Sequence, residues 1–302
     1  MKIRNFNDIY QKLLSEKSPI LDTLHTRVLI SAGSIFAILI IFCIAMSMDM
    51  VNGTVMGCFA IAEIFAVVIY ILTSTKYRSI YKQTVIANMV RAYDPELNFE
   101  HKYGVTEAQY NKAGFREYHD RFRSEDLIFG RIDDEYDIRM SEVKTEREER
   151  TTDSEGHTQT TYVTVFQGIY GYIDVKDKFL PYFEVCSNKF FGKYDKARIE
   201  VDSAEFEKYY DLYAEDKIRT MEVFTSDLIE KFNIFKDKLN TPIQIKVKNG
   251  TLFFRLKMNN SFEAPTFGKA LDFKAMSHNF DLMNEPLSLF SKIFENAKDT
   301  LD

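Results

Sequence analysis

Two almost uncharged stretches decide the fold: VLISAGSIFAILIIFCIAMSM at residues 28–48 and TVMGCFAIAEIFAVVIYILT at residues 54–73. The first has 21 residues without a charge, and the only charge in the second is Glu63. At a rise of about 1.5 Å per residue the first stretch spans roughly 31 Å, which matches the hydrocarbon core of a bilayer. A backbone that crosses a bilayer must satisfy its hydrogen bonds internally. The two stretches therefore predict a transmembrane helical hairpin over residues 27–75.

A cleaved signal peptide is the competing interpretation of the first stretch. However, 27 residues precede it, and a signal peptide has a shorter apolar region of about 7 to 15 residues. Basic residues flank the hairpin, whereas the connection at residues 49–53 has none; they are Lys12, Lys17 and Arg27 on one side, and Lys76, Arg78, Lys82 and Arg91 on the other. The positive-inside rule then predicts a multi-pass protein of the inner (cytoplasmic) membrane with both termini in the cytoplasm.

Residues 1–26 are predicted to contain an amphipathic helix, because apolar residues recur at helical spacing among charged ones. These apolar residues are Ile3, Phe6, Ile9, Tyr10, Leu13 and Leu14. Such a helix lies in the membrane interface or packs its apolar stripe on the large domain.

Residues 76–302 predict a cytoplasmic domain. The first 75 residues hold five basic and five acidic side chains, so the whole net charge of −6 belongs to the remainder. An acidic surface makes nucleic acid a poor partner. Three cysteines and the absence of a CxxC pair give no disulfide framework or zinc ribbon.

The pattern of residues 76–175 predicts helices and strands in turn. A helix continues from the membrane to Tyr93, and a second runs from about Thr106, a plausible N-cap, to Phe122. Residues 126–143 and 161–175 alternate as two strands of an antiparallel pair. The connection at 144–160 has no large apolar residue, which predicts a mobile hairpin loop.

The second half of this domain has a similar mixture. We predict a strand at 196–201, a helix capped by Asp202 or Ser203 that carries Phe206, Tyr209 and Tyr210, and helices at 225–239 and 284–301. Residues 243–258 form the strongest hairpin signal, because alternating strands flank Asn249-Gly250, a typical type I′ turn. The predicted fold class is α+β: an N-terminal two-helix transmembrane hairpin, followed by a cytoplasmic domain with an antiparallel sheet and flanking helices.

Several phrases resemble bacterial membrane proteins of the domain of unknown function 3137 family. They begin with Tyr81-Lys82 and Asp94-Pro95 and continue with Ser124-Glu125-Asp126-Leu127, Gly130, Met140-Ser141-Glu142-Val143, Val165 to Tyr170, Asp202 to Tyr209, Tyr213-Ala214-Glu215-Asp216, Leu228-Ile229-Glu230 and Asn249-Gly250. The resemblance covers residues 76 to 260. It implies a membrane-anchored cytoplasmic α+β domain, and it supplies no catalytic residues.

Glu63 is the first candidate site residue, because a charge at the centre of a span costs on the order of 2.5 to 3.5 kcal/mol. In a hairpin that turns near residue 50 it lies level with Ile38 and about one turn from Ser34, whose hydroxyl is a possible hydrogen-bond partner. The functional hypothesis is a proton or cation relay, or polar contact between protomers. The alternative is a protonated carboxyl that is bonded within the hairpin.

Small residues are candidates for close helix packing in lipid. Gly53 and Gly57 form a GxxxG step, and Gly33 and Ala37 are a similar pair on the first span. This packing occurs within one chain or between two copies.

The other residues with reactive or metal-binding side chains also have purely structural interpretations. His119-Asp120 suits a metal or acid-base site only if the fold supplies a partner, and Cys186 has no neighbouring base in the sequence. An acidic cluster, a possible Ca²⁺ site without the known spacing, is more typical of a turn between strands; it comprises Asp133, Asp134, Glu135 and Asp137. A set of aromatic residues lines either a ligand pocket or the core; it comprises Phe190, Phe191, Tyr209, Tyr210 and Tyr213. No cofactor or metal is predicted.

Together these features favour a membrane-anchored binding or scaffolding module. Its expected partners are the lipid bilayer and either a second copy or a cytoplasmic protein. The first alternative is a membrane-bound enzyme that acts on lipid or peptide, and the second is an oligomeric transport component that uses Glu63.

Overall fold

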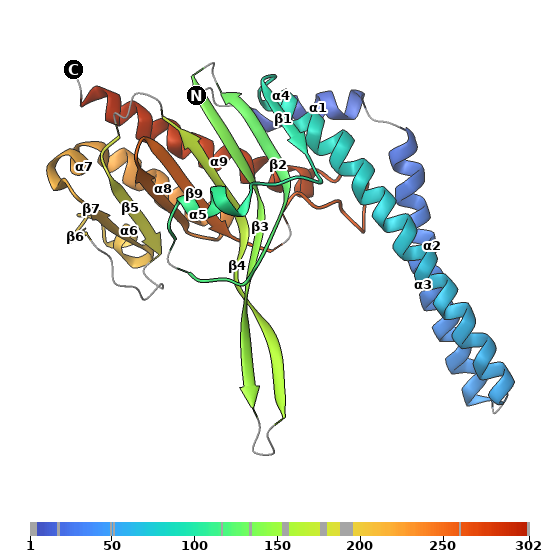
Figure 1. Cartoon of the computed structure of the whole chain (residues 1–302). Helices are drawn as coiled ribbons and strands as arrows, with labels where there is room; N and C mark the ends of the chain where they lie inside the picture. Colours follow the sequence, from blue (N-terminus) through green and yellow to red (C-terminus); the bar gives the residue numbers. More distant parts are fainter. Residues whose placement is uncertain are drawn as a thin grey trace. The chain divides into compact units, whose positions relative to one another are not determined.

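The computed structural model describes residues 5–16, 19–48, 50, 52–115, 117–132, 135–152, 157–175, 180–187, 196–259 and 261–300 (Figure 1). It divides into two compact units. The first, here called the helical unit, comprises Phe6–Met89 and Phe262–His278, and the second, the sheet unit, consists mainly of Val90–Ser261 and Asn279–Asp302. Each unit is described by itself.

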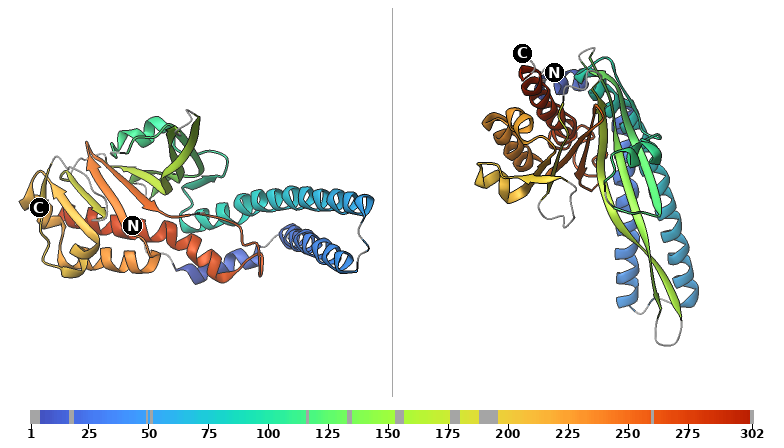
Figure 2. Two further views of the ribbon diagram at one scale, coloured as in Figure 1. Left: turned by 90° about the horizontal axis from the view of Figure 1, so that it is seen from below. Right: turned by 60° about the vertical axis from the view of Figure 1, so that its left-hand side comes forward.

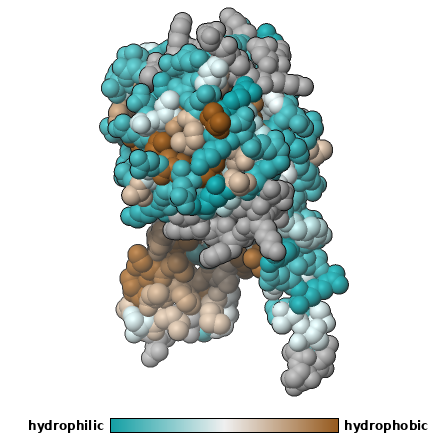
Figure 3. All heavy atoms as spheres, turned by 90° about the vertical axis from the view of Figure 1, so that its left-hand side faces the viewer, coloured by the Kyte–Doolittle hydropathy of each residue, from teal (hydrophilic) through white to brown (hydrophobic). Residues whose placement is uncertain are grey.

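The helical unit contains α1 (Phe6–Ser15), α2 (Pro19–Ser47) and α3 (Gly53–Tyr81). Both α2 and α3 are long and apolar enough to cross a membrane, and only 11% and 6% of their most apolar windows are buried. That exposure is the opposite of what the core helix of a soluble protein shows. Figure 3 shows the same apolar surface in brown along these helices.

Both long helices extend beyond the apolar stretches of the sequence. Pro19 is the first residue of α2, a position where its fixed φ and missing N–H do no harm. Asn52 caps α3 by accepting a hydrogen bond from the backbone N–H of Val55 at 3.0 Å. After Tyr81 the helix continues as a π-helical segment, Lys82–Ile86, and then as α4 (Ala87–Tyr93). The predicted helix from Lys76 to Tyr93 is therefore present with a π-bulge inside it.

Helix α1 packs within the protein. The rings of Phe6 and Tyr10 contact the ring of Phe273 at centroid distances of 5.1 and 5.0 Å, and the Tyr10 hydroxyl donates to the carbonyl of Leu271 at 3.2 Å. Ile9, on the same face of α1, is buried. This contact supports core packing, the second of the two alternatives for the N-terminal amphipathic helix.

The sheet unit holds an antiparallel sheet in which the structure describes nine strands, in the order β1-β2-β3-β4-β9-β8-β5-β7-β6. The strands are β1 (Leu97–Glu100), β2 (Arg121–Ile132), β3 (Tyr136–Thr152), β4 (Thr158–Asp174), β5 (Phe183–Ser187), β6 (Ala197–Ile199), β7 (Tyr210–Ala214), β8 (Ile243–Lys248) and β9 (Thr251–Lys257). With the helices around it, this sheet confirms the predicted α+β class.

Helices cover both faces of the sheet (Figure 2). They are α5 (Glu107–Lys112), α6 (Ala204–Tyr209), α7 (Lys217–Val223), α8 (Ser226–Leu239) and α9 (Phe273–Asp299). On one face Phe290 of α9 packs its ring on Phe254 of β9 at 4.8 Å. On the other face Tyr110 of α5 packs on Tyr170 of β4, also at 4.8 Å.

Local sequence signals predicted several elements correctly. The β8–β9 hairpin turns at Asn249 and Gly250, which have the positive φ angles of 53° and 77° that a type I′ turn requires. Thr225 caps α8, and Thr106 forms a capping box with Gln109 at the start of α5.

Other predicted boundaries are wrong. Helix α5 ends at Lys112 and not at Phe122, because the chain turns at Gly114 (φ 64°) and enters β2 at Arg121. Tyr210 begins β7 instead of continuing the helix from Ser203. The C-terminal helix begins at Phe273, earlier than residue 284.

The predicted strand at 126–143 and loop at 144–160 also need correction. The first contains the end of β2 and the start of β3, which are joined by a turn where Ile132 pairs with Tyr136. Most of the second is strand, because β3 continues to Thr152 and β4 begins at Thr158. Backbone pairing, alternating charges and β-branched threonines hold this region without any apolar core.

Candidate functional site

Glu63 lies in the contact between the two long helices. It lines a small apolar pocket of about 220 Å³ together with Ile38, Leu39, Phe42, Met56, Phe59 and Ala60. Its Oε2 atom is buried and has no hydrogen-bond partner in the structure. Ser34 does not fill this role, because its hydroxyl donates to the carbonyl of Ser31 at 2.8 Å. The role of Glu63 stays a prediction.

The small residues of the two long helices point away from the contact between α2 and α3. A Cβ atom added at Gly33, Gly53 or Gly57 would meet no atom within 4 Å, and Ala37 is exposed. The contact instead uses a hydrogen bond between Ser31 and Thr73 at 3.2 Å, and packing of the Phe42 ring on the Phe59 ring at 5.2 Å. Packing of these small residues against a second copy also stays a prediction.

The other sequence candidates do not come together in one site. The aromatic set separates, because Tyr210 is buried and donates to the carbonyl of Phe232, whereas Tyr209 lies beside Lys236 on the surface. Phe190 and Phe191 lie outside the described residues. Cys186 is buried in β5, and its thiol donates to the carbonyl of Asp211 at 3.7 Å.

The acidic cluster is divided between two ion pairs. Glu135 pairs with Lys298 of α9, and Asp137 pairs with Arg131 at 3.2 Å. Asp133 and Asp134 lie outside the described residues. In the part of the chain that the structure describes, no group of three or more His, Cys, Asp or Glu side chains has the arrangement of a metal site.

A buried ionic cluster on the α5 face of the sheet is a feature that the sequence did not indicate. Arg255 of β9 is 4% exposed, and its guanidinium donates two hydrogen bonds to the carboxylate of Glu117 and one to the amide oxygen of Gln244. The same guanidinium lies 4.3 Å from the centroid of the Phe115 ring. These contacts fix the segment after α5 on the sheet.

A second buried ion pair lies on the same strand as Gln244. Lys246 of β8 is 3.4 Å from the carboxylate of Glu184 of β5 and donates to the carbonyl of Gly114 at 3.2 Å. Lys246 and Glu184 are register partners across the two strands. The two ion pairs together hold Gly114, Phe115 and Glu117 in place, shortly before Asp120 in the chain.

Beyond this point β3 and β4 leave the sheet as a two-stranded ribbon (Figure 1). We call this ribbon, Glu146–Thr152 with Thr158–Thr164, the arm. The last β2 partner of β3 is Arg121, opposite Glu146, and the last β9 partner of β4 is Lys257, opposite Gly168. Beyond these pairs, the strand pairing in the described part of the arm is that of β3 with β4.

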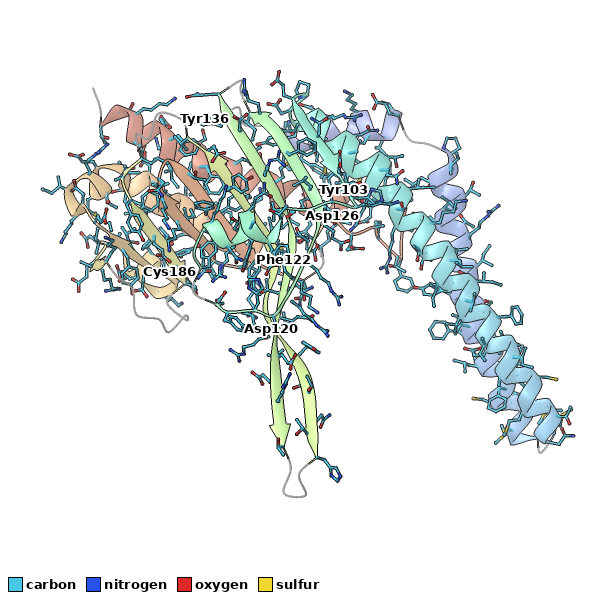
Figure 4. All side chains as sticks on the ribbon, in the orientation of Figure 1. Tyr103, Asp120, Phe122, Asp126, Tyr136 and Cys186 are labelled. Carbon is cyan, nitrogen blue, oxygen red and sulfur yellow. The ribbon has the colours of Figure 1, made fainter. Side chains whose placement is uncertain are left out.

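Asp120 fastens the base of the arm (Figure 4). Its backbone N–H donates to the carbonyl of Glu146, and its carboxylate accepts from the backbone N–H of Glu148 at 2.7 Å and from the Tyr118 hydroxyl at 2.7 Å. The bond from Glu148 lowers the pKa of Asp120 below its usual value. His119, which the sequence paired with Asp120, instead bonds Glu107 at 3.0 Å. Asp120 is therefore structural here.

Side-chain pairs stiffen the arm itself. The Arg121 guanidinium lies 3.2 Å from the centroid of the Tyr162 ring, and the Tyr162 hydroxyl donates to Glu148 at 3.2 Å. Arg147 and Arg150 form ion pairs with Glu149 and Glu148 along β3, both at 2.5 Å. At the base, a polar pocket of about 360 Å³ is lined by Arg123, Ser124, Glu125, Glu142, Lys144 and Gln167.

The two strands of the arm differ in charge. Residues 146–150 of β3 are all charged, whereas residues 158–165 of β4 carry no charge and no Pro or Gly. Residues 157–164 are all exposed. The arm therefore presents one charged strand and one uncharged strand to its surroundings, and an exposed strand edge is a surface to which another chain can add.

The chain matches one family model. Residues 164–295 fit the model of a protein of unknown function, DUF3137. This stretch, which is less than half of the chain, is similar to the DUF3137 family. The family match confirms the resemblance inferred from the sequence, but over a different range, because it starts later than residue 76 and continues past residue 260. No match was found among curated proteins or among solved structures.

The DUF3137 match runs from the base of the arm in β4 to near the end of α9. It includes both buried cations, Arg255 and Lys246, and also Glu184. Glu117, α5 and nearly the whole arm precede it, as do the phrases between Tyr81 and Val143 that carried part of the resemblance. The matched region thus holds β5–β9, α6–α8 and most of α9, whereas β1–β3 and nearly all of the arm precede it.

Proposed function

We propose that this protein is a membrane-anchored binding or scaffolding module that uses the arm to contact another protein chain. The two apolar helices supply the anchor, and the sheet unit supplies a rigid base for the arm. The observation that carries the proposal is the exposed uncharged edge of β4. Partners add to such an edge through main-chain hydrogen bonds.

The distribution of basic residues supports a cytoplasmic position for the sheet unit. Lys76 and Arg78 follow the second apolar stretch, and Arg27 precedes the first, whereas the connection has neither Lys nor Arg. With both termini on this side, the protein is a two-span protein of the cytoplasmic membrane. Lys82 contributes less to the excess of positive charge on this side than the sequence indicated, because it is buried and paired with Glu263 at 3.1 Å.

A protease experiment tests this orientation. In sealed inside-out membrane vesicles, added protease is expected to digest the sheet unit, and in sealed right-side-out vesicles it is expected to leave the unit intact until detergent is added. A tag at either terminus reports the same accessibility. Digestion of the sheet unit in right-side-out vesicles contradicts the proposed orientation.

Shortening the arm tests the proposed contact. Glu149 and Thr161 are register partners, so replacing Arg150–Thr160 by Asn-Gly closes the ribbon with a two-residue turn and keeps the Asp120–Glu148 contact. Intact membranes are treated with an amine-reactive crosslinker, and the protein is then purified. We expect the yield of crosslinked protein species to be at least about tenfold lower for the shortened protein than for the full-length chain.

The control is the melting temperature of the shortened protein in detergent, which is expected to stay that of the full chain, because no core residue is removed. If the folded, shortened protein yields the same crosslinked species in the same amounts, the arm is not the contact element and the proposal is wrong.

A further inference from the structure

We infer that the chain that adds to the arm is a second copy of this protein, paired edge to edge along Thr158–Thr164 of β4. This inference rests on the proposed function and names its partner. It starts from the direction in which the backbone groups of the arm point.

The contacts of Asp120 give this direction. Asp120 bonds the carbonyl of Glu146 and the N–H of Glu148, so the backbone groups of these two residues point away from β4. The direction of the backbone N–H and C=O groups alternates along a strand. The backbone groups of Arg147 and Glu149 therefore point toward β4, where the register partners of these residues are Val163 and Thr161.

On β4 the backbone groups of every second residue then point away from β3. These residues are Thr158, Thr160, Tyr162 and Thr164. Their N–H and C=O groups lie on the edge that β9 does not reach, because the pairing of β9 with β4 ends at Gly168 and a last bond from Met258 to Gln167. The edge offers a complete ladder side to a partner strand.

The composition of this edge favours pairing with itself. Natural edge strands are usually protected by charges, Pro or a bulge, and residues 158–164 have no charge and no Pro. An antiparallel pair of two copies centred on Thr161 places Thr160 opposite Tyr162 and Thr158 opposite Thr164. Every outward backbone group then has a partner, and Thr–Tyr cross-strand neighbours are favourable.

The charged strand explains why such an assembly stops at two copies. After pairing, the outer edges of the four-stranded ribbon are the two β3 strands, whose Arg147–Arg150 segment is charged and tied into ion pairs. A two-fold pair uses the same surface on both subunits and is closed. Pairing also converts a two-stranded ribbon, which is marginal in water, into four strands.

Disulfide crosslinking in native membranes tests the register. In a full-length chain with Cys43 and Cys58 replaced by Ala, Thr161→Cys places the two sulfur-bearing residues opposite each other in a non-hydrogen-bonded pair, where the Cβ atoms are close enough for a disulfide. Oxidation is expected to yield a dimer at twice 35.3 kDa.

Val163→Cys is the matched control. Val163 lies on the same strand face and is also exposed, but the proposed register places its two copies four positions apart. We expect at least about tenfold less dimer than with Thr161→Cys. Adding Thr160→Pro to Thr161→Cys removes an outward N–H without removing a β3–β4 bond, and is expected to reduce the dimer to the level of the control.

Equal crosslinking of Thr161→Cys and Val163→Cys, or no effect of Thr160→Pro, overturns the inference. If neither variant forms a dimer while shortening the arm still removes crosslinks to a different protein, the arm remains the contact element and only the second copy is wrong. If shortening the arm changes nothing, the proposed function itself fails.

Discussion

Replacing Arg255 by Ala is expected to lower the free energy of unfolding of the sheet unit by about 2–4 kcal/mol, because it leaves a partly buried carboxylate without its cation. Glu117 accepts two bonds from the guanidinium, and its side chain is 23% exposed. Gln244 loses its partner as well, and the Phe115 ring loses its contact with the cation.

Urea-induced unfolding of the full chain in detergent, followed by tyrosine fluorescence, measures the change. Arg139→Ala is the matched control, because Arg139 is exposed and its guanidinium lies 5.7 Å from the centroid of the Phe129 ring; we expect a loss of at most about 0.5 kcal/mol. Replacing Arg255 by Met and Glu117 by Leu together is expected to recover most of the loss, since no unpaired charge remains.

A loss below about 1 kcal/mol for Arg255→Ala, equal to that of Arg139→Ala, contradicts the structural role of the cluster. The same result removes the reason to regard Phe115 and Glu117 as part of a rigid base for the arm.

Elements that depend on neighbouring residues were predictable from the sequence. The apolar stretches reveal the two long helices because a span needs about twenty apolar residues in a row. The β8–β9 hairpin follows from Asn249-Gly250, and the starts of α5 and α8 follow from Thr106 and Thr225. In each of these elements the deciding contacts lie within a few positions of one another.

The arm and the ionic cluster were not predictable for a physical reason. Arg255 and Glu117 are 138 positions apart, so no local pattern joins them, and in the sequence Arg255 is indistinguishable from an outward polar residue of a hairpin. Residues 144–160 lack apolar side chains, which is a good predictor of a loop. Here main-chain pairing and charge pairs between neighbours hold the strands without burial.

In the candidate site, too, a feature set by neighbouring residues was predictable, whereas features set by packing were not. The sequence singled out Glu63 because a charge in an apolar stretch is locally visible, and the structure places it in the contact between the long helices. The sequence could not show that the Ser34 hydroxyl bonds within its own helix, or that the small residues face outward. Both features depend on how the two helices pack.

Replacing Gly168 by Ala is expected to lower the free energy of unfolding by about 3 kcal/mol or more. Gly168 has a φ of 152°, which side-chain-bearing residues rarely adopt, and an added Cβ would lie 1.9 Å from the carbonyl oxygen of Leu256. That oxygen belongs to the backbone of β9, so it moves only if the pairing of β4 with β9 opens.

The position of Gly168 makes its effect local as well as global. It is the last residue of β4 that pairs with β9 before the arm begins. We therefore expect hydrogen exchange of the Met258 amide, which bonds the carbonyl of Gln167, to accelerate more than exchange in the β8–β9 turn. Disulfide formation by Thr161→Cys is expected to fall in the same variant, because the base of the arm is no longer fixed.

Gly57→Ala is the comparison, since an added Cβ there meets no atom within 4 Å and the residue lies within α3. Alanine is the better helix former by about 1 kcal/mol, so this variant is expected to keep or slightly raise stability. If Gly168→Ala unfolds like the unsubstituted chain and leaves Met258 protected, the close contact between β4 and β9 is wrong, and with it the point from which the arm projects.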